Sequence, residues 1–215
     1  MSKFRGPRLR VVRRLGKLFA LTHKKPKRFI RPGQHGRKER RRKPTHFSNR
    51  LAEKQKLRFY YGVSEKQVIC YLKAARRAQD PTGPILLRLL EIRLDTLVYR
   101  LGWVVTLPEA RQLVIHGHFS VNQERQRLHV PSFSCVPGHC ISVRGTGTDL
   151  DEQRPMLKIL VLERIIEASN CAPSLLFLIS STHAPTAFVH QRLDRSETGV
   201  DLKERLIIEY YSNRL

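Results

Sequence analysis

Positive charge is concentrated in the first quarter of this chain of 215 residues. Residues 1–60 contain 22 Lys and Arg against 2 acidic residues, whereas residues 61–130 contain 10 against 6 and residues 131–215 contain 9 against 10. A segment with so many like charges repels itself and cannot fold alone. The sequence therefore predicts a basic arm joined to a folded body. The expected partner of the arm is a polyanion, either nucleic acid or an acidic membrane surface.

Helix breakers divide the arm, which we place at residues 1–47. Gly6-Pro7, Arg31-Pro32-Gly33 and Lys43-Pro44 exclude a long helix, apart from one or two turns within residues 9–19. We expect the arm to become ordered only where phosphates neutralise its charge. The run RKERRRK at residues 37–43 suits a nuclear address, another polyanion contact or a merely solvated stretch.

The rest of the chain has the composition of a folded protein, with 40% hydrophobic residues overall. It contains no run of 18 apolar residues, which excludes a membrane-spanning helix. The basic start is poor in Ser and continues through Arg42, so we interpret it as part of the working protein and not as a targeting peptide. Four cysteines without framework spacing indicate reduced thiols in an intracellular compartment and no disulfides.

Amphipathic patterns predict two helices after the arm. The first spans Ser48 to Tyr61 and ends at Gly62, with Leu51, Gln55 and Phe59 on its packing face. The second begins with a capping box formed by Ser64 and Gln67 and ends at Asp80-Pro81. Cations that share one face form basic stripes on both helices, and beside such an arm we interpret them as polyanion contacts more than as solvated faces. These cations are Arg50, Lys54 and Arg58 on the first helix, and Lys66, Lys73 and Arg77 on the second.

Shorter elements are expected between residues 82 and 145. A Leu-rich helix follows Thr82-Gly83-Pro84 and supplies core, and Asp95 can cap a short helix that closes at Gly102. A capping box of Thr106 and Glu109 opens a further helix that ends at His116-Gly117. Breakers then separate short strands at Phe119–Asn122, Leu128–Val130 and Cys140–Arg144.

The last third of the chain is less regular. Residues 156–168 fit a helix with one apolar face, and residues 171–199 support no firm assignment. Residues 206–211, with the sequence LIIEYY, predict a final strand buried on the side of Leu206, Ile208 and Tyr210.

Catalytic and metal-binding patterns are weak. The chain lacks the usual local signatures of nucleotide binding and hydrolysis, and Asp95 and Glu109 are better explained as helix caps than as a carboxylate pair. Cys135 and Cys140, with His129 or His139, offer zinc ligands, but no second pair at the right spacing completes a site. We therefore predict no catalytic residue, no metal and no cofactor.

An ordered series of short motifs in residues 93–132 resembles the RNA-binding module named after ribosomal protein S-four. The motifs are Arg93-Leu-Asp95, Tyr99-Arg-Leu-Gly102, Ala110-Arg-Gln-Leu-Val114, His116-Gly-His-Phe119, Val121-Asn122 and Val130-Pro-Ser132.

Motifs outside this module resemble the rest of the same small-subunit ribosomal protein family, most closely its plastid or cyanobacterial branch. The likeness covers residues 1–145 and about 204–213. It departs from the family at Asn122, which Gln123 follows where a glycine is usual, so that turn must be rebuilt. The further motifs are Arg5-Gly-Pro-Arg-Leu9, Arg31-Pro-Gly-Gln-His-Gly36, Glu53-Lys-Gln-Lys-Leu-Arg58, Tyr61-Gly-Val63, Ala75-Arg-Arg-Ala78 and Ile208-Glu-Tyr-Tyr-Ser212.

The resemblance implies an α+β, mainly helical fold. A helical body carries the basic arm and an inserted small α/β RNA-binding module of the S-four type. The expected parts are the arm (1–47), a helical N-terminal domain (48–90) joined by residues 204–215, the module (91–145) and an unassigned extension (146–203).

The resemblance also implies a structural protein of the small ribosomal subunit. Such a protein binds the 5′ domain of small-subunit rRNA early at a multi-helix junction and nucleates assembly. It then lines the region where mRNA enters, beside other small-subunit proteins such as S-five, and supports translational accuracy. The branch implies a ribosome of the chloroplast (plastid) stroma, with the cyanobacterial cytoplasm as the alternative, and no membrane partner.

Residues and resemblance together give a set of candidate RNA contacts, because Arg binds phosphate bidentately and Lys supplies point charge. The set consists of Arg5, Arg8, Arg10, Arg13, Arg14, Arg31, Gln34, His35, Arg37, Lys38, Arg50, Lys54, Lys56, Arg58, Lys73, Arg76, Arg77, Arg93, Arg100, Arg111, Gln112, His116 and His118. Arg93 can instead pair with Asp95, and Gln112 can be simple surface.

Two alternatives remain at this stage. The module also occurs as an appendage of RNA-modifying enzymes, but the flanking segments carry no motif for a catalytic domain. A general nucleic-acid packaging protein would use the arm alone, and its binding would fall steeply with salt and show no preference among RNAs.

Overall fold

The chain divides into two units in this structure, a computed structural model. Met1–Leu87 and Gly199–Leu215 form the first unit, and Arg88–Thr198 forms the second. Helices predominate, and a small antiparallel sheet lies in the second unit, which confirms the mainly helical α+β class. The structure describes residues 4–34, 36, 45–122, 129–143, 177–180, 186–189 and 201–212.

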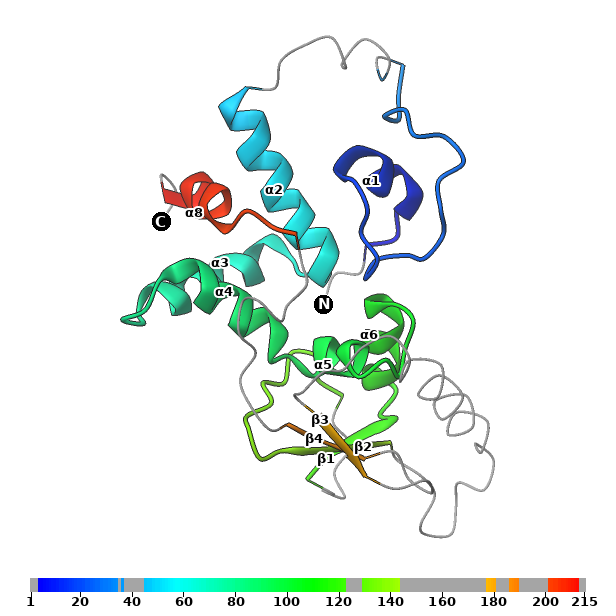
Figure 1. Cartoon of the computed structure of the whole chain (residues 1–215), viewed down its shortest axis with the longest axis vertical. Helices are drawn as coiled ribbons and strands as arrows, with labels where there is room; N and C mark the ends of the chain where they lie inside the picture. The colour runs from blue at the N-terminus through cyan, green and yellow to red at the C-terminus, as the bar shows by residue number, and fades with distance from the viewer. Residues whose placement is uncertain are drawn as a thin grey trace. The chain divides into compact units, whose positions relative to one another are not determined.

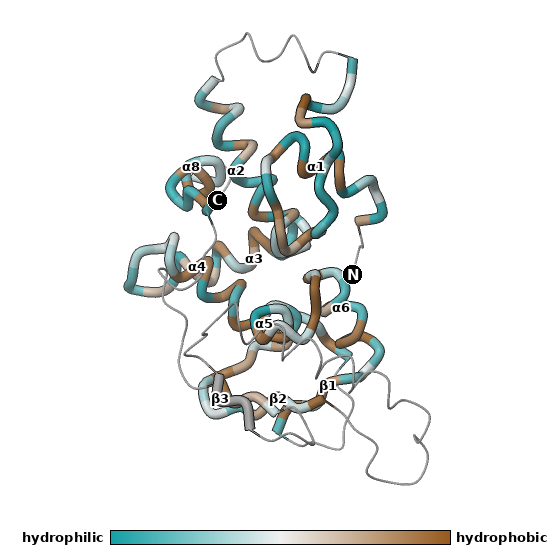
Figure 2. Tube along the Cα trace, turned by 45° about the vertical axis from the view of Figure 1, so that its right-hand side comes forward, coloured by the Kyte–Doolittle hydropathy of each residue, from teal (hydrophilic) through white to brown (hydrophobic). Residues whose placement is uncertain are grey.

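Helix α1 (Arg8–Leu15) lies within the arm and packs near helix α2 (His46–Tyr61). Val12 is buried with Leu18 and Leu21, and Phe59 of α2 packs against this cluster. Hydrophilic and hydrophobic residues alternate through α1 and the chain that follows it (Figure 2). The prediction that the arm orders only on phosphate therefore needs correction, because apolar side chains between the cations give part of it a small core.

Helix α2 begins two residues earlier than predicted. Thr45 is its N-cap, and the Thr45 side chain accepts a hydrogen bond from the Ser48 N–H. Gly62 ends the helix as expected, with φ of 60° in the left-handed region that favours glycine. The fully buried face differs from the predicted one: Leu57 and Tyr61 lie on it, and so does Lys54 of the predicted basic stripe.

Helix α3 (Glu65–Arg76) opens with the predicted capping box. The Gln67 N–H donates to the Ser64 hydroxyl, and the Ser64 N–H donates to the Gln67 side chain. The helix ends before Asp80-Pro81, and helix α4 (Thr82–Glu91) begins at Thr82. Leu86, Leu87 and Leu90 of α4 are buried, so the Leu-rich segment supplies core as predicted.

The predicted final strand is wrong, because residues 204–212 form helix α8 (Glu204–Ser212). Ile207 and Tyr211, four residues apart, are its buried residues, in place of the alternating set expected for a strand. Figure 1 shows α8 (red) lying beside α2 (cyan), so helix packing within the first unit satisfies its apolar face. The Nε of Arg50 donates to Glu209 at 2.8 Å and adds a polar link between the two helices.

Glu65 joins three helices of the first unit. The Tyr211 hydroxyl donates to its carboxylate at 2.7 Å, and Lys54 Nζ lies 2.8 Å from the same group. Burial alone would raise the pKa of Glu65, but hydrogen bonds from Lys54 and Tyr211, together with the charges of Lys54 and Arg58, lower it below 4.5. Burial and the Glu65 carboxylate raise the pKa of Tyr211, which stays a neutral donor.

We predict that Glu65→Gln destabilises the chain by about 1–3 kcal/mol at neutral pH, because Lys54 is left buried without a counter-charge. A carboxyl group whose pKa is lower in the folded state than in the unfolded state stabilises the protein at pH values above its unfolded pKa. Glu65 is such a group, and its contribution to stability is lost as the pH falls through its folded pKa. The variant should therefore show a smaller loss of stability than the wild type below pH 4.5. Urea unfolding at pH 7 and at pH 3.5 would measure both effects. If the free energy of unfolding changed by the same amount between the two pH values in the wild type and in the variant, Glu65 would not be the stabilising counter-charge of Lys54.

The second unit combines two helices with a sheet. Helices α5 (Leu94–Arg100) and α6 (Leu107–Ile115) lie on one side of the sheet in Figure 1. The sheet is four-stranded and antiparallel, with the order β1-β2-β4-β3. In register, Ser120 faces Ser142 between β1 and β2, and Ile141 faces Ala187 between β2 and β4. The strands are β1 (Phe119–Val121), β2 (Cys140–Val143), β3 (Phe177–Ser180) and β4 (Thr186–Val189).

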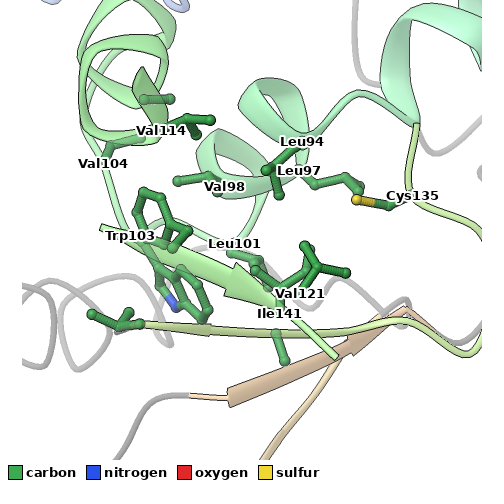
Figure 3. Packing of buried hydrophobic residues seen from close by; sticks show 14 of the residues in the cluster. Leu94, Leu97, Val98, Leu101, Trp103, Val104, Val114, Val121, Cys135 and Ile141 are labelled. Atoms are coloured by element: carbon green, nitrogen blue, oxygen red, sulfur yellow. The ribbon is translucent and has the colours of Figure 1, made fainter. Parts of the chain in front are cut away.

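The core of the second unit lies between these helices and the sheet (Figure 3). Leu94, Val98 and Val114 from the helices meet Val121 and Ile141 from the strands, and all are buried. The Trp103 ring stacks on Phe119, with 5.7 Å between ring centroids. Helix faces and strand faces with apolar residues thus fix the layer arrangement.

Two of the three predicted strand positions are confirmed by β1 and β2, which each end within one residue of the prediction. The prediction for Leu128–Val130 is wrong at Val130, which is not in a strand, and Leu128 lies outside the described residues. Residues 131–135 instead pair with the start of α5: the Leu94 N–H donates to the Phe133 carbonyl, and the Cys135 N–H donates to the Ile92 carbonyl. Pro131 cannot donate to a ladder, which favours this short irregular pairing.

Part of the unassigned extension completes the sheet. Strands β3 and β4 both come from residues 146–203, and β4 pairs with β2. The predicted helix at residues 156–168 lies outside the described residues.

Helix α6 confirms its predicted end and corrects its predicted start. It ends at Ile115, and Gly117 has φ of 72°. Thr106 is the N-cap, but its side chain makes no cap hydrogen bond; the Glu109 carboxylate accepts from the Val105 N–H instead.

Candidate nucleic-acid interface

The described part of the arm presents most of its candidate cations to solvent. Arg5, Arg10, Arg14 and Arg31 are exposed, as is Gln34. Arg8 and Arg13 are half-buried, while His35, Arg37 and Lys38 lie outside the described residues. Helix α1 therefore holds its apolar residues against α2 and still displays charge. Such a surface can contact several phosphates of a polyanion at once.

A second cationic surface lies on α3, also in the first unit. Lys73, Arg76 and Arg77 are exposed at and just after the last turn of this helix, and Lys66 is exposed in its first turn. Val68, Leu72 and Ala75 face the core from the other side of α3, so packing directs the cations outward.

The candidate cations of α2 are engaged within the protein. Lys54 is buried against Glu65, and Arg58 lies 3.4 Å from the same carboxylate. Arg50 pairs with Glu209, and Lys56 donates to the Asp201 carbonyl. Arg50 and Lys56 use exposed acids as partners, and exposed pairs of this kind are weak enough for a phosphate to compete. Lys54 has a structural role instead of the expected RNA contact.

Asp95 organises the second unit. Its carboxylate accepts from Nε and Nη2 of Arg93, each at 3.0 Å, and from Nη2 of Arg111 at 2.6 Å. It also accepts from the Thr96 N–H in the first turn of α5. The prediction that Asp95 caps this helix is wrong, because Arg93 is the N-cap and makes no side-chain cap hydrogen bond, whereas Asp95 lies in the first turn, where its charge is favourable. The side chains of Arg93 and Asp95 are 0% exposed, and that of Arg111 is 17% exposed. Arg93 therefore has a structural role in place of the expected RNA contact, and Arg111 is mainly committed to Asp95.

Arg100 is likewise held by a carboxylate. Its Nε and Nη2 donate to the two Glu91 oxygens at 2.9 and 2.6 Å, and Glu91 is buried. The bidentate pair ties the end of α5 to the end of α4.

Three polar candidates remain at the end of α6. Gln112 and His116 are exposed, and His118 is half-buried. The rings of His116 and His118 have centroids 6.2 Å apart. These side chains can donate hydrogen bonds to RNA from one small surface of the second unit.

Several exposed residues of the arm were not singled out from the sequence. Lys24, Lys25, Lys27 and Arg28 are exposed, and Phe29 is the most exposed large apolar side chain of the described chain at 77%. The signal was present in the run of cations around Pro26, followed by an aromatic residue, which is a typical composition of a nucleic-acid contact.

The cysteine and histidine candidates for zinc do not gather into a site. Burial raises the pKa of Cys135 to about 12 and also raises that of Cys140, which favours the neutral thiols that bind zinc poorly. His139 accepts from the Val136 N–H, and His129 bonds the Ile115 carbonyl. In the described part of the chain no group of three or more possible ligands could hold a metal ion. No helix there has the length and apolar character needed to cross a membrane.

Two family models match the chain in succession. The model for the ribosomal protein S4/S9 N-terminal domain matches residues 3–91, and the model for the S4 domain matches residues 92–128.

Full-length relatives agree with these models. The chain is 47% identical over 216 residues to the small ribosomal subunit protein uS4 of Synechocystis, and 43% identical over 219 residues to that of Thermosynechococcus vestitus. It is 45% identical over 214 residues to the small ribosomal subunit protein uS4c of Pyropia yezoensis. Each alignment covers 100% of both proteins, so cyanobacterial proteins and a chloroplast protein match to a similar degree.

Proposed function

The chain belongs to the uS4 family of small ribosomal subunit proteins, a family without enzymatic activity, and from this premise we propose that it binds small-subunit rRNA as a structural constituent of the ribosome. Identity along the whole length disfavours an RNA-modifying enzyme, which would need a catalytic domain beside the module.

The observation that carries this proposal is the set of exposed cations on the first unit. Acids take up the charges of α2, whereas the cations of the arm and of α3 point to solvent. Exposed cations at this density favour a polyanion, because each phosphate that they bind releases counterions. The cations are Arg5, Arg10, Arg14, Arg31, Lys73, Arg76 and Arg77.

We propose that the two units contribute differently to binding. The arm supplies affinity, since Arg and Lys bind phosphates of any sequence. Gln112, His116 and His118 of the second unit present directional donors that match the shape of one folded RNA. Arg93 of the second unit and Lys54 of the first unit are buried, and each has a structural role within its own unit instead of an RNA contact.

The site of action follows from the same family premise. We propose binding at a multi-helix junction in the 5′ domain of the rRNA, where the protein nucleates small-subunit assembly. Later it lines the region where mRNA enters, beside S-five, and supports translational accuracy. We place it in ribosomes of the plastid stroma, with the cyanobacterial cytoplasm as the alternative that the relatives support equally.

Binding of the full chain to the 5′ domain of plastid or cyanobacterial small-subunit rRNA, with excess unrelated RNA as competitor, tests this function. We expect the affinity for the 5′ domain to survive the competitor and about 0.3 M salt, because nonspecific phosphate contacts weaken steeply over that range. Equal loss of binding to both RNAs would instead favour a packaging protein that uses the arm alone.

A further inference from the structure

A cavity of about 600 Å³ lies within the arm, beside α1. Its lining consists of Leu9 and Arg13 of α1 together with Lys24, Lys25, Pro26, Lys27 and Arg28. Its volume is within the usual range of small-ligand sites, about 300–1,000 Å³. Five of its seven lining residues are cations, which sets its chemistry apart from an ordinary surface hollow.

Contacts within the arm hold the segments that line the cavity in place. The Nε of Arg13 donates to the Ile30 carbonyl at 2.8 Å and so ties α1 to the chain after Arg28. Val12, Leu18 and Leu21 pack beneath α1, so the helix does not depend on a ligand for its position. These contacts fix the lining segments through the protein itself, and preorganisation of this kind increases affinity.

Acidic residues are scarce in the part of the chain that forms the cavity. Among the described residues, no acidic side chain pairs with Lys24, Lys25, Lys27 or Arg28, and residues 1–60 contain only 2 acids in total. Their mutual repulsion is relieved when a multiply charged anion binds among them. Leu9 and Pro26 leave an apolar area in the same lining, which suits the flat face of a base or ribose.

We propose that this cavity binds one nucleotide of the rRNA at a sharp turn of its backbone. Adjacent phosphates lie among Arg13, Lys24, Lys25, Lys27 and Arg28, while the base or ribose lies against Leu9 and Pro26. This proposal rests on the proposed function and adds to it a defined nucleotide site within an arm otherwise assigned general phosphate contacts. A free nucleotide has the same chemistry, and the experiment separates the two sources.

The test compares two variants that each replace three cations. The first is Lys24→Gln, Lys25→Gln and Lys27→Gln in the cavity. The control is Arg50→Gln, Lys203→Gln and Arg205→Gln, which lie outside the arm, with Arg50 in an ion pair with Glu209. We expect the cavity variant to bind the 5′ domain RNA at least about tenfold more weakly than the control. Its salt slope should fall by about three, because each lysine that binds a phosphate contributes about one to that slope. Equal weakening in both variants would overturn the proposal.

Crosslinking gives a second readout that does not depend on a substitution. Full-chain protein bound to 4-thiouridine-labelled 5′ domain RNA should yield a nucleotide crosslink at Leu9 or within residues 24–28. Crosslinks confined to other parts of the arm would overturn the site. A titration with ADP should show no saturable micromolar binding; ADP binding that the RNA does not displace would make a free nucleotide the occupant instead.

The two proposals fail in different ways. If the wild type does not distinguish the 5′ domain from unrelated RNA, the proposed function fails. If the wild type distinguishes them while the cavity variant and the control behave alike, only the nucleotide site fails.

Discussion

Replacing Asp95 by Asn is expected to lower the free energy of unfolding of the second unit by about 3–5 kcal/mol. The carboxylate is the counter-charge of Arg93, which is fully buried, and of Arg111. Asn keeps the shape of the side chain but leaves a buried guanidinium without compensation. The effect is large because both partners of the Arg93–Asp95 pair are removed from water.

Fluorescence of Trp103 provides a local measurement of this effect. Trp103 is the single tryptophan of the chain and is fully buried in the core of the second unit, so its urea transition reports on that unit. Glu109→Gln serves as a control, since Glu109 also accepts a backbone hydrogen bond at a helix start but is exposed in that contact. A midpoint for Asp95→Asn close to that of the control would show that the buried pair contributes little.

The same network changes the expectation for Arg111. From the sequence, Arg111 is a candidate RNA contact. In the structure two of its nitrogens donate to Asp95, so Arg111→Ala should act mainly by destabilising the second unit. Weaker RNA binding by this variant is then expected to parallel its loss of folded protein.

Local sequence signals located most helices of the described chain correctly. The capping box of Ser64 and Gln67 and the stops at Gly62 and Gly117 depend on a few neighbouring residues, and all three are confirmed. These signals work because capping hydrogen bonds and left-handed φ values are decided within one turn of the chain.

Tertiary contacts decided the elements that the sequence missed. The segment LIIEYY alternates well enough for a strand, but its apolar residues also fit a helix face, and the surface of α2 selects the helix. Strands β3 and β4 are four residues each and exist through pairing with β2, so nothing local marks them strongly.

In the candidate interface, too, local sequence signals predict some features and tertiary contacts decide the others. Exposed cations of α1 and α3 follow from the apolar spacing of their own helices. The pairing of Arg50 and Lys56 does not, because their acidic partners, Glu209 and Asp201, lie 159 and 145 residues further along the chain. A basic stripe in a sequence therefore gives the number of cations but not which of them are already neutralised.

Deleting residues 1–47 is expected to weaken binding to the 5′ domain RNA at least about 1,000-fold at 0.2 M salt and to flatten its salt dependence. The deletion removes Arg5, Arg10, Arg14 and Arg31, which are exposed on the arm. It also uncovers Phe59, against which the arm packs, so the deletion combines removal of charge with removal of packing.

Charge neutralisation separates these two effects. The triple variant Arg10→Gln, Arg14→Gln and Lys17→Gln keeps the apolar residues of α1 and should reduce the salt slope by about three. The matched control, Arg50→Gln, Lys203→Gln and Arg205→Gln, removes the same charge around α8, where Glu204 and Glu209 offset it, and should reduce the slope by about one or less. Equal slopes for the two variants would mean that net charge alone governs binding, in which case the arm has no special role.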